Sequence, residues 1–312
     1  MDGPGIDTNG DGIVDALALD TDCDGTFDSM DVDGDLIADF ETSRRPPAKN
    51  VPGCNTGSGG TSGGSGGGGG SGPSQLGMAT YQGTGNSTDR YAESDVYRNG
   101  VGYKFIANGW GTNWQNHQIT WNGTSFTIAS LNGTQGSDFS PAGYPTVFCG
   151  NYSQKQSIGT CGLPAPISGL ASIRTGWRWA ANGNNGEYNA AWDIWIGNGT
   201  TLSAYLMVWL RDPPVQRPAG AAALAGATIN GLPGSWTIWT GAVNSRPIVN
   251  YVRAEGADLG ELEFDVMAVY NDAIGRGYAL PGTHIMSVAV GFEVWNGPVT
   301  NLQSLDFYVD VN

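Results

Sequence analysis

The sequence is poor in charge and in cysteine and has no long hydrophobic run, and each shortage excludes a class of protein. No apolar stretch reaches the roughly 20 residues of a transmembrane helix, so we expect no membrane span. Charged residues make up 14% of the 312, and there is no basic stripe of the kind that binds nucleic acid. The four cysteines include no Cys-x-x-Cys pair, which disfavours a zinc or redox site.

Acidic residues are concentrated at the N-terminus. Residues 1–41 hold 13 of the 29 acidic side chains and none of the 14 basic ones, which leaves 16 acids against 14 bases in the remainder. The nearly neutral remainder suits a neutral partner such as a polysaccharide. The 50 glycines and 11 tryptophans favour a β-rich protein that is secreted or displayed at the cell surface. In such a protein we expect two disulfides, Cys23–Cys54 and Cys149–Cys161, with buried free thiols as the alternative.

Three nine-residue segments repeat within residues 1–41: DTNGDGIVD from Asp7, DTDCDGTFD from Asp20 and DVDGDLIAD from Asp31. Each places carboxylate or amide oxygens at alternate positions around a glycine, which is how a flexible loop surrounds Ca²⁺. The predicted ligands are Asp7, Asn9, Asp11, Asp15, Asp20, Asp22, Asp24, Asp28, Asp31, Asp33, Asp35 and Asp39. An EF-hand is excluded, because the glutamate twelve residues on is missing and no helical segment follows. The segments resemble thrombospondin type 3 calcium-binding repeats, and a solvated acidic tail is the alternative.

Residues 42–75 are predicted to be a linker between two folding units. SRRPPAKNVPGC (43–54) is stiffened by proline, and residues 55–72 contain 11 glycines in 18 positions, a composition typical of flexible coil. From residue 76 to residue 312, short alternating runs such as HQITWNGTSFTIASLNG (117–133) are divided by Asn-Gly and Pro-Gly turns. This pattern predicts an all-β jelly-roll sandwich, in which only residues 262–277 have helical spacing.

Nine segments of the third region carry a family resemblance. They are NGWG (108–111), YPTVFCG (144–150), GLPAPISGLASIRTGWRW (162–179), NAAWDIW (189–195), YLMVWL (205–210), PVQ (214–216), WTIWTG (236–241), FDVMAVYNDAIGRG (264–277) and GFEVWNG (291–297). In this order they resemble glycoside hydrolase family 12, from about residue 78 to the C-terminus. The resemblance implies a jelly roll with a concave cleft, endo-β-1,4-glucanase or xyloglucanase chemistry without a catalytic cofactor, and β-1,4-glucan or xyloglucan as the partner.

The resemblance also assigns catalytic roles. In a retaining glycosidase one carboxylate attacks the anomeric carbon, and a second protonates the leaving oxygen and later activates water. The acid/base corresponds to Glu293, whose flanking Phe292 and Trp295 should raise its pKa. Asp193 corresponds to the residue that assists the nucleophile. In SAYLMVWLRD (203–212), however, Tyr205 stands where the family has its nucleophilic glutamate.

Three consequences of Tyr205 are open. The tyrosine could itself attack, as in sialidases, although a neutral glucan gives no reason to avoid an anionic nucleophile. Asp193 could activate water and invert the anomeric centre, although the bulky Tyr205 would occupy the space of that water. We favour the third, a domain that keeps its groove and has lost most or all turnover.

Aromatic side chains are expected to line the groove. Tryptophans can stack on pyranose faces, and amides can bind sugar hydroxyls, although any one tryptophan can equally fill a core. The candidates for stacking are Trp110, Trp177, Trp179, Trp195, Trp209, Trp239 and Trp295, with Met207 on the groove strand and Asn108 and Gln216 as hydrogen-bond partners.

A structural or adhesive extracellular protein is the alternative function. In that case the calcium repeats would mediate self-association, and the jelly roll would be a building block. Binding to cellulose or xyloglucan favours the carbohydrate-active protein, whereas calcium-dependent assembly without glycan affinity favours the structural one.

We predict that Ca²⁺ stabilises residues 1–41. Twelve clustered oxygen ligands repel one another without a counter-cation, so removal of the ion should unfold this segment and leave the jelly roll intact. Titration calorimetry measures the uptake, and an absence of binding at millimolar Ca²⁺ would contradict the prediction.

Overall fold

The computed structural model describes residues 74–77, 79–134, 140–184, 186–254 and 258–312, together with four short strands near the N-terminus. The chain divides into two units, Met1–Gly67 and Gly68–Asn312, and each is considered by itself. The predicted linker up to residue 73 lies outside the described residues. Ser74 and Gln75, the last residues of that predicted linker, belong to the second unit and form hydrogen bonds with Glu263 and Arg98 within it.

The N-terminal unit contains one antiparallel sheet of short strands. These are β1 (Gly5–Ile6), β2 (Ala16–Leu19), β3 (Ser29–Asp31) and β4 (Phe40–Glu41), paired in chain order. Each predicted calcium repeat therefore lies, in the sequence, between two strands that pair with each other. The predicted ligands lie outside the described residues except for Asp31, of which only the backbone in β3 is described.

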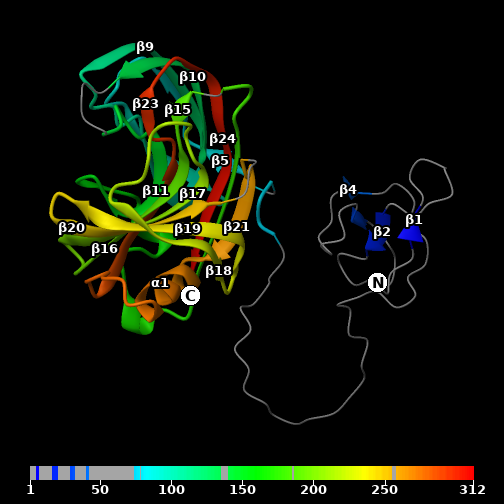
Figure 1. The fold of residues 1–312 in the computed structure, drawn as a ribbon. Coiled ribbons are helices and arrows are strands. Elements are labelled where there is room, and N and C mark those ends of the chain that lie inside the picture. The colour runs from blue at the N-terminus through cyan, green and yellow to red at the C-terminus, as the bar shows by residue number, and fades with distance from the viewer. Residues whose placement is uncertain are drawn as a thin grey trace. The chain divides into compact units, whose positions relative to one another are not determined.

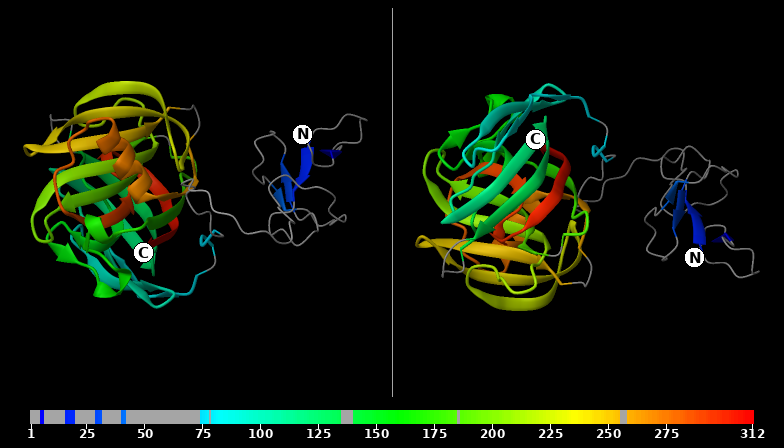
Figure 2. Two further views of the ribbon diagram at one scale, coloured as in Figure 1. Left: turned by 90° about the horizontal axis from the view of Figure 1, so that it is seen from below. Right: turned by 90° about the horizontal axis from the view of Figure 1, so that it is seen from above.

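The second unit is built on two sheets, visible from above and below in Figure 2. The larger sheet contains β5 (Tyr81–Gln82), β7 (Glu93–Arg98), β8 (Val101–Ile106), β11 (Thr146–Tyr152), β12 (Lys155–Gln156), β13 (Ala165–Pro166), β16 (Ala190–Gly197), β17 (Leu202–Arg211), β18 (Ala221–Ile229), β19 (Leu232–Val243), β20 (Arg246–Arg253) and β22 (His284–Gly291). Its main path runs β18-β19-β20-β17-β16-β22-β11-β8-β7-β5, with β12 beside β11 and β13 beside β22. All its pairings are antiparallel except that of β17 with β20.

The smaller sheet packs against the larger one and completes a sandwich (Figure 1). It contains β6 (Thr84–Ser87), β9 (Asn113–Asn122), β10 (Ser125–Thr134), β14 (Ile173–Ala180), β15 (Glu187–Tyr188), β21 (Glu261–Asp265), β23 (Val294–Asn296) and β24 (Val299–Val311). Its path is β15-β23-β10-β24-β14-β21, extended by β9 beside β10 and by β6 beside β9. The expected all-β jelly-roll sandwich is confirmed.

Alternation along β17 shows how the sequence divides its side chains between the core and the opposite face. Ala204, Leu206, Val208 and Leu210 belong to the main core between the sheets. Met207 and Trp209 belong to a second apolar cluster, against which Tyr205 packs. Successive residues of a strand point to opposite faces, so this strand is apolar on both.

The expected helix and one of the two expected disulfides are present. Helix α1 (Val266–Gly275) begins after Asp265, whose carboxylate accepts a 3.0 Å hydrogen bond from the Met267 amide and so caps the helix. The Cys149–Cys161 disulfide joins β11 to the 3₁₀ turn η1 (Gly159–Cys161). The predicted Cys23–Cys54 disulfide lies outside the described residues. In the part of the chain that is described, no helix has the length and apolarity of a membrane span.

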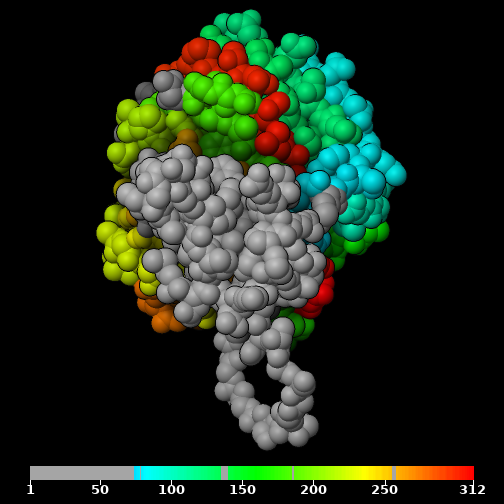
Figure 3. Space-filling model, turned by 90° about the vertical axis from the view of Figure 1, so that its right-hand side faces the viewer, coloured from blue at the N-terminus to red at the C-terminus, as the bar shows by residue number. Residues whose placement is uncertain are grey.

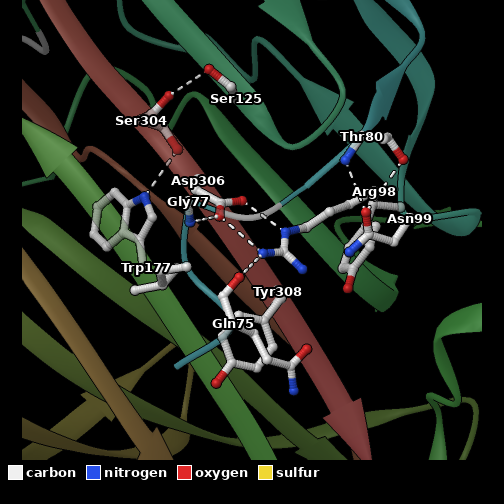
Figure 4. A network of polar contacts seen from close by, with 12 residues as sticks. Gln75, Gly77, Thr80, Arg98, Asn99, Ser125, Trp177, Ser304, Asp306 and Tyr308 are labelled. Atoms are coloured by element: carbon white, nitrogen blue, oxygen red, sulfur yellow. Dashed lines mark hydrogen bonds and ion pairs between the residues drawn. The ribbon is translucent and has the colours of Figure 1, made fainter. Parts of the chain in front are cut away.

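A buried ion pair joins the start of this unit to its last strand. The Arg98 guanidinium donates to Asp306 at 2.8 and 2.9 Å, and both side chains are only 3% exposed. Asp306 also accepts a 2.8 Å hydrogen bond from the Gly77 amide, and Arg98 donates to the Gln75 carbonyl (Figure 4). Segments from the two ends of the unit, cyan and red, lie against each other at the surface (Figure 3). Burial would raise the pKa of Asp306, but its hydrogen bonds from Arg98 and Gly77 outweigh this and lower it.

We predict that Asp306→Asn destabilises the protein by about 3 to 5 kcal/mol, because it leaves the Arg98 charge buried without its partner. Glu261→Gln is the matched control: its pair with Arg178 is 43% and 39% exposed, so we expect a loss below about 1 kcal/mol. Denaturant unfolding measures both values.

Because the pKa of Asp306 is lowered, the stabilisation should hold above about pH 4 and be lost as the pH falls further. Equal losses for the two variants would contradict the prediction.

Candidate active site

A groove of about 770 Å³ lies on the face of the larger sheet opposite the main core. Its floor includes a row of side chains in register across four neighbouring strands. Asp193 of β16 pairs with Met207 of β17, Met207 pairs with Asn250 of β20, and Asn250 pairs with Trp239 of β19. All four residues line the groove, so one row brings together a carboxylate, a thioether, an amide and an indole.

Glu293 reaches the groove because the chain changes sheets there. β22 belongs to the larger sheet and ends at Gly291, whereas β23 belongs to the smaller sheet and begins at Val294. Phe292 is fully buried in the core against Trp177 and Trp179. The chain therefore turns Phe292 into the core and Glu293 into the groove at a break between two strands.

Asn189 holds the Glu293 carboxyl in place. The Asn189 side-chain amide donates to Glu293 Oε2, its Oδ1 accepts from the Glu293 backbone amide at 2.8 Å, and its backbone amide donates to the Glu293 carbonyl at 3.0 Å. Burial, together with the nearby charge of Asp193, raises the pKa of Glu293 to about 8, although the Asn189 bond lowers it. At neutral pH Glu293 is therefore mostly protonated and can donate a proton.

Asp193 is 8% exposed and is held by two aromatic donors. The Tyr152 hydroxyl and the Trp195 indole donate to its Oδ2 at 2.8 and 2.9 Å. Its Oδ1 has no hydrogen-bond partner among the described residues. Burial raises the pKa of Asp193 to about 6, and the two hydrogen bonds oppose that rise. The carboxylate is thus ionised at neutral pH while Glu293 remains protonated.

Tyr205 lines the groove two residues along β17 from Met207, beside Trp195. The two ring centroids are 5.9 Å apart with planes at 88°. Burial and the charge of Asp193 raise the pKa of the Tyr205 hydroxyl, and the neighbouring Arg246 guanidinium only partly offsets them. The hydroxyl is therefore an uncharged phenol at neutral pH.

The structure brings together most of the residues predicted from the sequence. Lining the groove are Trp110, Asp193, Tyr205, Met207, Trp209, Trp239, Glu293 and Trp295. Trp110, the most open of the four tryptophans in this set, is 43% exposed, as a stacking platform at the rim would be.

Five other predicted residues do not line the groove. Trp177 and Trp179 are core residues between the sheets, so the stacking role expected for them is wrong. Trp195 stands beside Asp193 and lines a neighbouring cavity of about 520 Å³. The Asn108 side-chain amide donates to the Tyr144 carbonyl at 3.2 Å and so holds a loop. The Gln216 backbone amide donates to Glu187 at 3.1 Å, while its side-chain Oε1 has no hydrogen-bond partner among the described residues.

Asn189, Tyr152 and Asn250 are site residues that the sequence interpretation missed. Asn189 is the first residue of the segment NAAWDIW, and Tyr152 lies two residues after the end of YPTVFCG. Their positions in or beside these segments could have identified both as site residues. Asn250 is a polar residue inside the otherwise apolar run IVNYV (248–252), which is the only signal it offers. Within the described part of the chain, no cluster of His, Cys, Asp or Glu is arranged to hold a metal ion.

Comparison of the chain with known protein families identifies one family to which it is similar. Residues 101–312 match the model of glycosyl hydrolase family 12. No curated protein sequence matches the chain. Among solved structures, the endoglucanase Cel12A from Rhodothermus marinus is 27% identical with a TM-score of 0.61, and the alignment covers 73% of this chain and 98% of that one. A metagenome-derived family 12 endoglucanase is 26% identical with a TM-score of 0.63, over 74% and 99%. A family 12 xyloglucanase from Bacillus licheniformis shares the fold at 20% identity and a TM-score of 0.59, over 73% and 100%.

We predict that Glu293→Gln weakens the pH dependence of stability. The pKa of Glu293 is about 8 in the folded protein and about 4.3 when unfolded, so the folded state retains a proton that the unfolded chain releases. Wild-type stability should therefore fall as the pH rises from about 4 to 8, and the variant should lose less over that range. Thermal unfolding across this range measures the difference. Equal slopes for Glu293→Gln and wild type would contradict the prediction.

Proposed function

Because the chain belongs to glycosyl hydrolase family 12, we propose that its groove binds β-1,4-glucan or xyloglucan chains and hydrolyses them slowly or not at all. The aromatic lining supports binding, since Trp110, Trp209, Trp239 and Trp295 offer apolar faces to pyranose rings. The mixture of many apolar side chains with a few polar ones is typical of a small-molecule or oligosaccharide site.

One observation carries the proposal of impaired hydrolysis: Tyr205, which the family resemblance assigns to the nucleophile position, is an uncharged phenol. Retaining hydrolysis needs an anionic or base-activated group at the anomeric carbon. The raised pKa of Tyr205 keeps its proton in place at neutral pH. Asp193 contributes to that rise, and its Oδ2 is already bound by Tyr152 and Trp195.

The other catalytic parts are retained in this proposal. Glu293 holds the proton that a leaving oxygen would need, and Asn189 orients it. Asp193 stands where it could orient a carboxylate introduced on β17, because it lies one strand away and faces the same groove. A nucleophile and an acid act as a unit, so the loss of one removes most of the rate enhancement.

Asp193 offers a second route to turnover. Its Oδ1 lacks a hydrogen-bond partner among the described residues, and the carboxylate is ionised at neutral pH. Such a group could activate water for inverting hydrolysis. We consider this route the lesser one, because the Tyr205 ring lies in the groove beside it.

We also propose that the protein is extracellular and that its repeats bind Ca²⁺. The Cys149–Cys161 disulfide supports an oxidising compartment. The regular placement of the paired strands β1 to β4 between the acidic repeats supports a repeated ion-binding unit. Such a unit would display the glucan-binding domain, and calcium-dependent self-association is the structural alternative.

We predict that Tyr205→Glu raises β-glucanase activity at least about a hundredfold, because it restores the missing member of a catalytic unit. Tyr205→Gln is the matched control, since it has the same size as the glutamate variant but no charge, and it should stay as inactive as wild type. A reducing-sugar assay on β-glucan, xyloglucan and carboxymethylcellulose measures all three proteins. Glu293→Gln added to Tyr205→Glu should remove the gain.

Robust hydrolysis by the wild-type chain would contradict the proposal. NMR of its first product would then identify the route: an inverted anomer indicates water activated by Asp193, and a retained anomer indicates a covalent nucleophile.

A further inference from the structure

Asn250 stands out among the groove residues because it is a fully buried amide without a partner. Its exposed fraction is 0%, and neither Oδ1 nor Nδ2 has a hydrogen-bond partner among the described residues. A buried polar group in this state is destabilising, and most buried amides in proteins avoid it. An amide that the fold itself does not use is a candidate for binding a ligand.

The sheet register fixes where this amide lies. Asn250 is paired with Met207 on one side and with Trp239 on the other, and all three line the groove. Its strand neighbours on the same face, Ile248 and Val252, are apolar members of the groove-floor cluster. Asn250 is therefore the one polar side chain that β20 contributes to the groove lining, and its strand neighbours Ile248 and Val252 have no group that could form a hydrogen bond with it.

The distance to the reaction centre follows from the strand spacing. Asn250 lies two strands from Asp193, or about 10 Å across the sheet. An amide there would contact a sugar next to the reacting one rather than the reacting one itself. Its expected contribution is to affinity and to the choice of glycan, not to bond cleavage.

The chemistry of the amide defines the ligand. A carboxamide presents one acceptor and two donor hydrogens on adjacent atoms, which matches a pair of neighbouring hydroxyls, each able to donate and accept. A pyranose resting on the flanking indole would bring such a pair to Asn250. Trp239 is only partly buried, whereas Met207 is 6% exposed, so the sugar would rest on the Trp239 ring, and a shift of that ring would open Asn250 to it.

We propose that Asn250 is a saccharide-binding residue that forms paired hydrogen bonds with neighbouring hydroxyls of a glucosyl unit adjacent to the reaction centre. The proposal rests on the proposed function of the groove and adds a residue that determines its affinity. It also implies that the amide is kept at the expense of stability in the free protein, because its hydrogen bonds form only in the complex.

The test compares Asn250→Leu with wild type, using cellohexaose as the probe and titration calorimetry as the measurement. Leucine has a similar size and no polar atom, so binding should weaken about tenfold through the loss of two neutral hydrogen bonds. The melting temperature of the free variant should be equal to or higher than that of wild type, because an unpaired buried amide is removed. A purely structural role for Asn250 would lower the melting temperature and leave the affinity unchanged.

Two further variants complete the design. Thr124→Val removes another fully buried and unpaired polar group, in the turn between β9 and β10 and away from the groove, and should leave the affinity for cellohexaose unchanged. Asn250→Ala provides the affinity measurement if the leucine variant fails to fold, and it should weaken binding to a similar extent.

The outcomes separate the two proposals. If wild type binds cellohexaose and both Asn250 variants bind it equally well, the assignment of Asn250 is overturned and the proposed function stands. If wild type itself does not bind the probe at millimolar concentration, the assignment of Asn250 and the proposed binding of unbranched β-1,4-glucan are both overturned.

Discussion

The larger sheet is apolar on both faces, and the rest of the structure depends on which face is buried in the core and which lines the groove. One face of β17 forms the core with Leu206 and Val208, and the other forms the groove floor with Met207 and Trp209. A shift of one residue in the register would exchange the two sets and place Asp193 and Tyr205 between the sheets. The register of β16, β17 and β20 therefore decides both the stability of the sandwich and the composition of the site.

Burial in the groove determines which groups carry charge. Asp193 and Glu293 both have raised pKa values, but the hydrogen bonds from Tyr152 and Trp195 keep the pKa of Asp193 the lower of the two. The charge of Asp193, together with burial, then raises the pKa of Glu293. As the pH rises, Asp193 therefore ionises before Glu293. The same burial keeps Tyr205 protonated. An environment that suits a proton donor on one side of the groove thus works against a phenolic nucleophile on the other.

Much of the fold could be predicted from local patterns, and the site only in part. Alternation in residues 203–212 predicts a strand with two distinct faces, and β17 is divided in this way between core and groove. Alternation in residues 173–180 places Trp177 and Trp179 on one face but cannot tell which sheet face it meets, and both lie in the core rather than in the groove. The position of Glu293 at a change of sheet, and its contact with Asn189, depend on pairings between residues about a hundred positions apart. No local pattern encodes such a contact.

Buried polar groups lie both in the scaffold and in the groove, and some of each have no hydrogen-bond partner among the described residues. In the scaffold, the buried charges of Arg98 and Asp306 satisfy each other and the neighbouring backbone. In the groove, Asp193 Oδ1, the Trp209 indole nitrogen and both amide atoms of Asn250 have no partner among the described residues. Each unpaired atom lowers the stability of the free protein and would recover a hydrogen bond from a ligand rich in hydroxyls. A groove that served only as a structural surface would be more stable with apolar groups at these positions, so the presence of these polar groups supports the proposal that the groove binds sugar.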